Sequence, residues 1–216
     1  MKIGVFDSGV GGLSVANAIK RSLPDLDIVL KEDKKHVPYG TRQPQEILGF
    51  VIPIFQEMAD AGCRIIVVAC NTVSTNLIQE LRDRFKQVTM IAVEPMIKDA
   101  ARLSRSGVIT VCATPATLAS RRYAELKRRY AKDLTVLEPD CHEWAYMIEQ
   151  NDIDQDRIRT SIEGAINEGS DVIVLGCTHY HWIEKEIKGI ADSQAQVIQP
   201  EPVIVGQVKQ VLRQLA

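Results

Sequence analysis

The chain has 216 residues, of which 45% are hydrophobic and 25% charged, and its formal net charge is -2. This length suffices for one domain or two small ones with a buried core, and the small net charge offers no general attraction to nucleic acid or to a membrane surface. No apolar stretch approaches the roughly 20 residues of a membrane-spanning helix, and the first residues run into a predicted strand rather than a signal peptide, so we expect a cytoplasmic protein.

Strand-like and helix-like segments alternate along the whole chain. Short apolar runs bounded by turn residues predict strands at 2–6, 27–31, 64–69, 88–93, 107–112, 134–138, 171–176 and 195–198. Amphipathic spacing predicts helices at 11–22, 44–60, 73–85, 95–104, 116–131, 142–150, 154–168, 180–189 and 201–215. Such alternation is typical of parallel sheets covered by helices on both faces. Pro53, inside the second predicted helix, favours a kink or a break there.

The two halves of the chain repeat one arrangement. Cys70 and Cys177 follow similar apolar strands 107 residues apart, and the same shift carries Asp7 onto Thr114. We interpret this as the duplication of one α/β unit, although any two α/β halves share some rhythm of strand and helix. The predicted domains are 1–94 and 95–199, with a last helix within 200–216 that packs back on the first domain.

The five cysteines divide into two groups. An odd number without a CxxC pair favours free thiols over a disulfide framework. Cys63, Cys112 and Cys141 are interpreted as small buried hydrophobic residues. Cys70 and Cys177 stand instead at the carboxyl ends of predicted parallel strands, where open α/β folds bind their ligands. Two thiols at these positions could face one substrate from opposite sides.

Polar residues gather at the same strand ends. Asp7 and Ser8 open a glycine-rich turn before a helix, and the Asp7 carboxylate would either cap that helix or serve a site, for instance by orienting Cys70. His179 could assist Cys177, which it follows by two residues. The other candidates, which would bind the ammonium and carboxylate groups of an amino acid, are Pro38, Tyr39, Gly40, Asn71, Thr72, Thr114, Thr117 and Thr178.

A basic run lies in the predicted helix at 116–131 and extends to Lys132. Its lysines and arginines alternate with apolar residues at helical spacing, and they include no pattern of base-stacking aromatic residues. We interpret the run as the solvated face of an amphipathic helix, so no nucleic-acid partner is predicted.

Four motifs together carry a family resemblance. DSGVGGLS at 7–14, VPYGTR at 37–42, ACNT at 69–72 and GCTHY at 176–180 resemble, in this order and at these separations, the motifs of glutamate racemase. The resemblance covers most of the chain. It implies two pseudo-symmetric three-layer α/β/α domains with mainly parallel sheets and an active site in the cleft between them. It also implies racemisation of glutamate for peptidoglycan synthesis, without a cofactor or a metal.

The resemblance further implies residue roles. Cys70 would deprotonate the D-isomer and Cys177 the L-isomer, each from one face of the α-carbon. Asp7, His179 and Glu149 would assist. Glu149 is included because it ends a C-x7-E segment, starting at Cys141, like that of the family.

The chain also departs from the family pattern. Lys34 and His181 stand where the family usually has Thr and Pro, and the part of the chain after Cys177 is shorter than in most members. These departures bear on substrate affinity, regulation and the mode of dimerisation.

Other functions remain open alternatives. An aspartate racemase is less favoured, because such enzymes usually carry an acid after the GCT motif, where this chain has His179. A cysteine hydrolase would use Cys70 as nucleophile and His179 as base. A metal site would draw on Asp7, Cys70, Cys177 and His179, and an amino-acid binding protein would keep the cleft without chemistry. The expected partner is glutamate as a small-molecule substrate, and a homodimer is an open option.

Overall fold

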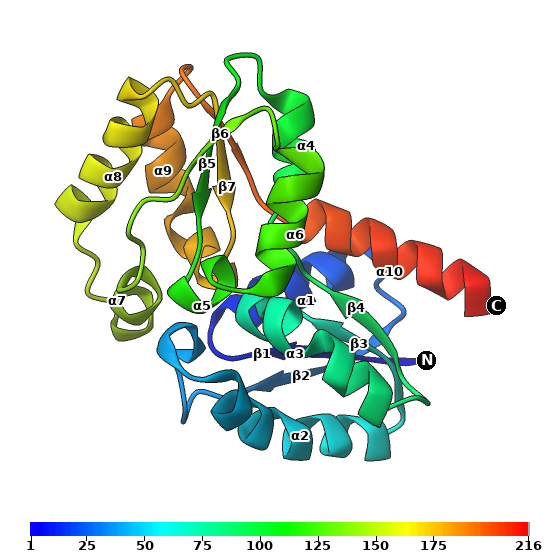
Figure 1. Ribbon diagram of the computed structural model, residues 1–216. Coiled ribbons are helices and arrows are strands. Elements are labelled where there is room, and N and C mark those ends of the chain that lie inside the picture. Colours follow the sequence, from blue (N-terminus) through cyan, green and yellow to red (C-terminus); the bar gives the residue numbers. More distant parts are fainter. Residues whose placement is uncertain (216) are drawn as a thin grey trace.

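The computed structural model describes residues 1–215. Two parallel sheets of four strands each occupy the upper and lower parts of Figure 1, with helices on both faces of each sheet. Every predicted strand is present, and its ends differ from the prediction by one residue at most. The predicted fold class, two pseudo-symmetric three-layer α/β units with parallel sheets, is confirmed.

The first sheet has the order β2-β1-β3-β4. Its strands are β1 (Lys2–Asp7), β2 (Asp27–Glu32), β3 (Cys63–Val68) and β4 (Thr89–Ala92). Helices α2 (Pro44–Asp60) and α3 (Asn71–Arg84) cover one face, and α1 (Gly11–Ser22) and α10 (Glu201–Leu215) cover the other. Ile204 and Val208 of α10 pack in one buried cluster with Ile3 of β1 and Val15 of α1.

The second sheet has the equivalent order β6-β5-β7-β8. Its strands are β5 (Val108–Cys112), β6 (Thr135–Leu137), β7 (Val172–Leu175) and β8 (Gln196–Ile198). Helices α4 (Ile97–Leu103) and α6 (Arg121–Tyr130) cover one face, and α7 (Trp144–Gln150), α8 (Gln155–Asn167) and α9 (Glu184–Ala191) cover the other. The short elements η1 (Tyr39–Thr41), α5 (Pro115–Leu118) and η2 (Thr178–Ile183) follow strands at the edge where the two halves meet.

The apolar pattern of the sequence explains these layers. In β3, Ile65 and Val67 face α1 and α10, whereas Ile66 and Val68 face α2 and α3, because side chains alternate along a strand. Helix α2 begins with Pro44 at its first turn, where a missing N–H costs nothing. It buries one stripe of side chains at helical spacing, namely Ile47, Val51, Phe55 and Met58.

Three predictions about helices were wrong in detail. Helix α2 continues through Pro53, which is exposed, so the break named as one of two outcomes there is absent, while Val51 and Phe55 lie buried in the core. The helix predicted at 116–131 is two helices, α5 and α6, because Ser120 caps α6 by accepting the Tyr123 N–H at 3.1 Å. The helix predicted at 180–189 begins instead as the 3₁₀ turn η2, and α9 follows it.

The strand register refines the internal repeat. Phe6 lies opposite Val68, and Cys112 lies opposite Leu175. The N–H of Ala69, which follows Val68, donates to the Phe6 carbonyl at 2.7 Å. The N–H of Gly176, which follows Leu175, donates to the Cys112 carbonyl at 2.7 Å. The equivalent of Asp7 is therefore Ala113, and Thr114 corresponds to Ser8, so the mapping of Asp7 onto Thr114 was wrong by one residue. The two cysteines keep their equivalence, because Cys70 follows Val68 and Cys177 follows Leu175 by two residues each.

All five cysteines are free and buried, as the odd count predicted. Over residues 1–215, no helix is both long and apolar enough to cross a membrane. The division of the chain at residue 94 stays a prediction, and residue 216 of the predicted last segment lies outside the described residues.

Gly11 and Gly49 allow a matched test of the contact between α1 and η2. A Cβ on Gly11 would lie 2.5 Å from the Cβ of Thr178 in η2 and 2.6 Å from its carbonyl carbon, whereas a Cβ on Gly49 would meet nothing within 4 Å. We expect Gly11→Ala to lower the free energy of unfolding by ~1–3 kcal/mol through overpacking, and Gly49→Ala to raise it by ~0.5–1 kcal/mol through helix propensity. Urea denaturation measures both, and equal effects of the two substitutions would contradict the tight approach of α1 to η2.

Candidate active site

Both cysteines predicted to act together line one buried cavity between the two halves. Cys70 is 4% exposed and Cys177 is 7% exposed. The free volume of the cavity is about 10 Å³, which is room for about one water molecule. Its lining comes from the segments that follow strands in both sheets, from the turn at η1 and from α7. The lining residues are Ser8, Val37, Pro38, Tyr39, Gly40, Cys70, Asn71, Thr72, Thr114, Ala145, Cys177, Thr178 and His179.

Most of the predicted site residues therefore meet at this cavity, and three stand behind it. Asp7, Thr117 and Glu149 do not line the cavity but contact residues that do. The sequence prediction omitted Val37, which belongs to the same turn as Pro38, and Ala145, for which the sequence carries no signal.

Cys70 has a hydroxyl partner and a helix start beside it. It ends the loop after β3 and precedes α3, and its Sγ lies 3.4 Å from the Ser8 Oγ. Burial and the nearby Asp7 carboxylate raise the pKa of the Cys70 thiol to about 12, against the opposing effects of Ser8 and the Val73 N–H. Cys70 is thus a protonated thiol at neutral pH in this arrangement.

Cys177 begins a chain of thiol, imidazole and carboxylate. Its Sγ lies 3.7 Å from Nδ1 of His179, and Nε2 of His179 donates 2.5 Å to Oε1 of Glu149. The same carboxylate oxygen accepts the Val10 N–H at 2.9 Å, so a contact from the first half also orients Glu149.

The hydrogen bonds among Cys177, His179 and Glu149 stabilise the charged forms of the imidazole and the carboxylate. Burial disfavours the imidazolium of His179, but its hydrogen bonds to Cys177 and Glu149 outweigh burial and raise the pKa of His179 well above its usual value. Burial likewise disfavours the Glu149 carboxylate, yet the hydrogen bonds from His179 and Val10 lower its pKa. The pair is therefore best described as an imidazolium beside a carboxylate, with the imidazolium next to the sulfur of Cys177.

Asp7 is fully buried and does not contact Cys70 through a hydrogen bond. Its Oδ2 accepts the N–H groups of Gly9 at 3.2 Å and Gly12 at 3.0 Å, and its Oδ1 accepts the Thr178 hydroxyl at 3.0 Å. The expected orientation of Cys70 thus falls to Ser8 rather than to Asp7. Burial raises the pKa of Asp7, against the effects of His179 and of these donors.

Asn71 has the unsatisfied polar groups of the cavity. It is 2% exposed, and neither its Nδ2 nor its Oδ1 has a hydrogen-bond partner among the residues that the structure describes. Leaving a buried donor and acceptor unpaired costs ~1–3 kcal/mol each. An amide of this kind, facing the cavity between two thiols, is suited to a ligand with both donors and acceptors.

Three threonine hydroxyls join the halves beside Asn71. Thr72 Oγ1 lies 3.0 Å from Thr114 Oγ1, which donates 3.0 Å to Thr117 Oγ1. The backbone of Gly40 packs closely against Thr114, since a Cβ on Gly40 would lie 2.6 Å from the Cβ of Thr114. The row of hydroxyls can be reoriented to donate to an oxyanion or to accept from an ammonium group.

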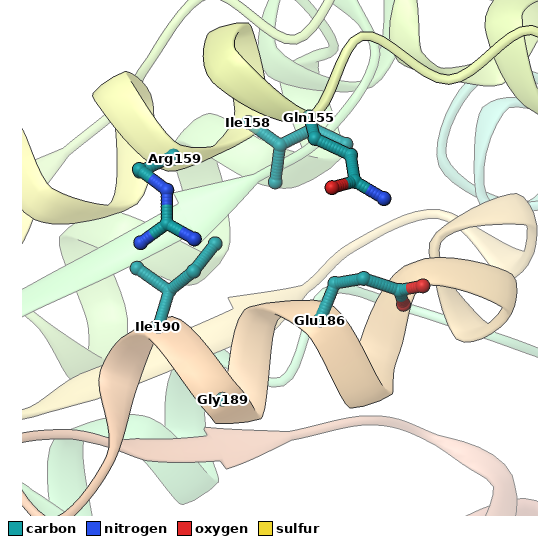
Figure 2. A pocket seen from close by; sticks show the side chains of 6 residues that line it. All are labelled: Gln155, Ile158, Arg159, Glu186, Gly189 and Ile190. Atoms are coloured by element: carbon teal, nitrogen blue, oxygen red, sulfur yellow. The ribbon is translucent and has the colours of Figure 1, made fainter.

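The geometry also bears on two other kinds of site. Within residues 1–215, no three His, Cys, Asp or Glu side chains are arranged to hold a metal ion. A larger hollow of about 310 Å³ lies between α8 and α9 (Figure 2), with Gln155, Ile158 and Arg159 on one wall and Glu186 and Ile190 on the other. Its arginine pairs with Glu163 of the same helix at 3.2 Å.

The sequence matches known proteins along almost its full length. The model of the Asp/Glu/Hydantoin racemase family matches residues 3–208. A glutamate racemase of Roseiflexus sp. (strain RS-1) is 33% identical over 216 residues, which is 98% of this chain and 79% of that protein. A glutamate racemase of Pseudomonas paraeruginosa is 36% identical over 214 residues, which is 97% of this chain and 81% of that protein.

Solved structures agree with this match. Escherichia coli glutamate racemase, crystallised with L-glutamate and the activator UDP-MurNAc-Ala, superposes with a TM-score of 0.90 at 29% identity and covers 98% of this chain and 82% of that one. Glutamate racemase from Aquifex pyrophilus gives a TM-score of 0.79 at 33% identity, covering 98% of this chain and 84% of that one. The resemblance seen in the motifs is thereby confirmed, and this chain belongs to the Asp/Glu/Hydantoin racemase family.

Proposed function

We propose that this protein interconverts L- and D-glutamate by two-base proton transfer at the α-carbon. One observation carries the proposal: two thiols at equivalent strand ends of two matched sheets line the same buried cavity. The family membership and the relatives named glutamate racemase support the same reaction.

In each turnover one sulfur would take a proton and the other would give one. In the L-to-D direction the Cys177 thiolate removes the α-proton, the electron pair stays on the α-carbon and its carboxylate, and the Cys70 thiol protonates the opposite face. The roles reverse for D-glutamate. The reaction consumes no co-reactant, because one proton leaves the substrate and one arrives, so no cofactor is proposed.

The charges of the free site suit the first of these directions. The Cys70 thiol, with its raised pKa, is ready to donate, and Cys177 stands beside the imidazolium of His179. Glu149 would keep His179 charged and oriented, while Asp7 would hold the turn on which His179 lies. Removing an α-proton also needs charge stabilisation near the substrate carboxylate. The N–H groups at the start of α3 are proposed to supply it.

The polar lining is proposed to hold the substrate. Asn71 would pair its free amide with the α-ammonium and carboxylate groups, and the hydroxyls of Thr72, Thr114 and Thr178 would bind the carboxylates. The cavity of about 10 Å³ is too small for an amino acid, so entry requires the two halves to separate. We propose that they move as the units 1–94 with the C-terminal helix and 95–199.

A hydrolase with Cys70 as nucleophile and His179 as base is less well supported, because His179 lies beside Cys177 and Cys70 lies beside Ser8. In the cell, the proposed product would be D-glutamate for peptidoglycan, made in the cytoplasm. We keep the homodimer as part of this proposal, and a measurement of molecular mass in solution tests it.

Replacing either active-site sulfur tests the two-base mechanism. We expect Cys70→Ser and Cys177→Ser each to lower the racemisation rate at least ~100-fold in both directions, because a hydroxyl is a poor base at neutral pH. Proton NMR of L-glutamate in D2O, with and without EDTA, follows the loss of the α-proton. Cys63→Ser is the matched control, since Cys63 starts the same strand that Cys70 follows and lies at the far end from the cavity. Wild-type racemisation by either active-site variant would return that cysteine to a structural role.

Glu149→Gln tests the electrostatics of the Cys177 side. Loss of the carboxylate should lower the pKa of His179, as measured by an NMR titration of the imidazole. In the wild type, the raised pKa gives stability that is complete below pH 6.5 and is lost as pH rises through the folded-state pKa. As pH rises from 6.5 through that pKa, the unfolding free energy of Glu149→Gln should therefore fall by less than that of the wild type. Glu143→Gln, an exposed change, is the control, and an unchanged His179 pKa in Glu149→Gln would refute the assignment.

Substrate preference separates glutamate from aspartate. We expect racemisation of L-glutamate to exceed that of L-aspartate by at least ~10-fold, since one methylene is worth ~1–3 kcal/mol in discrimination and the shorter acid cannot satisfy both ends of the polar lining. Circular dichroism of L-glutamate, L-aspartate and L-glutamine incubated separately with the protein gives the rates. Faster loss of optical activity with aspartate would overturn the substrate while keeping the mechanism.

A further inference from the structure

His181 forms a buried polar cluster that the proposed reaction does not use. Its Nδ1 lies 2.9 Å from Oε1 of Glu201 and 2.8 Å from Oγ of Ser14. The side chains of His181 and Glu201 are 5% and 15% exposed. The three residues come from η2, α10 and α1, so the cluster joins the turn after β7 to the two helices that cover one face of the first sheet.

The cluster is anchored at its far side. The backbone N–H of Glu201 donates 3.0 Å to Oε1 of Gln199, and the Ser14 hydroxyl donates 3.0 Å to the carbonyl of Gly11. The hydrogen bond from His181 lowers the pKa of Glu201 to about 2, so Glu201 is a carboxylate at neutral pH. A largely buried carboxylate that accepts from His181 resists displacement, because an unpaired charge would remain.

His179 lies between two fixed points of the same turn. At the start of η2, Thr178 donates to Asp7 across the cleft, and three residues later His181 is held by Glu201 and Ser14. With its first and fourth residues tied to Asp7 and Glu201, η2 has little freedom to rotate. The imidazole of His179 depends on that rotation to lie between Cys177 and Glu149.

Resting on the two-base function above, we propose that His181 is a positioning residue: held by Glu201 and Ser14, it fixes turn η2 and so aligns His179 for proton transfer at Cys177. His181 does not line the cavity, so in this proposal it exchanges no proton with the substrate. Its effect is therefore confined to the Cys177 side of the reaction, and the Cys70 side keeps its own support from Ser8.

The first experiment compares three variants. His181→Phe removes the donor, His181→Asn keeps a nitrogen donor near the position of Nδ1, and His142→Phe removes an exposed histidine that bonds Asp140 at 2.7 Å. We expect His181→Phe to lower kcat ~10-fold or more with KM changed less than ~2-fold, because small misplacements in a proton-transfer site are costly. His181→Asn should recover most of kcat, and His142→Phe should match the wild type.

Isotope effects identify the side affected. Because the two enantiomers are equal in energy, kcat/KM must fall equally in both directions, so rates alone cannot tell the sides apart. With α-deuterated L-glutamate, slower transfer at Cys177 makes removal of the label rate-limiting, and the isotope effect should rise in His181→Phe. With α-deuterated D-glutamate, Cys70 removes the label before the slow step, and the isotope effect should fall.

Each outcome decides the proposal. Wild-type kcat in His181→Phe, no recovery in His181→Asn, or a loss of rate with both isotope effects unchanged would overturn it. If His181→Phe fails to fold, Glu201→Ala and Glu201→Gln replace it, and only Glu201→Ala should show the opposed shifts of the two isotope effects. If the wild-type protein exchanges no α-proton of glutamate, the proposed function itself fails, a result distinct from a racemase that is indifferent to His181.

Discussion

A carboxylate cannot be buried without donors, and Asp7 meets this requirement with groups from both halves of the protein. The N–H groups of Gly9 and Gly12 reach one oxygen, and the Thr178 hydroxyl reaches the other. Burial without such partners would cost several kcal/mol. The Asp7 carboxylate therefore sets the glycine-rich turn before α1 and the turn after Cys177 at one fixed distance, and the rest of the site is arranged around that connection.

The groups proposed to transfer protons are held in place by the same connection. The turn before α1 also presents the Val10 N–H to Glu149, and Glu149 in turn holds His179 beside Cys177. On the other side, Ser8 from the same turn reaches Cys70. One short segment, residues 7–12, thus contacts the support of both thiols. The asymmetry between the thiols arises here, because one receives a neutral hydroxyl and the other an imidazolium paired with a carboxylate.

The two halves match more closely in backbone arrangement than in the side chains around the two thiols. Strand order and register match between the two sheets, and the cysteines occupy matched positions. The residues around them do not match, since the equivalent of Asp7 is Ala113. The proposed two-base reaction on mirror-image substrates would use two thiols in similar frames, one donating while the other accepts, and the unequal neighbours of the two thiols fit that difference.

The sequence by itself determined the strands, the parallel α/β class and the two strand-end thiols, because apolar runs and turn residues are local signals that survive without tertiary contacts. Local signals could not show that Ser120 divides a helix or that η2 precedes α9, since caps compete with helical spacing within a few residues. Only the tertiary structure decided that Ser8 rather than Asp7 touches Cys70, that Ala145 lines the cavity and that His181 meets Glu201. Ser8 and Cys70 are 62 residues apart and His181 and Glu201 are 20 apart, so their contacts depend on how the chain folds rather than on local sequence.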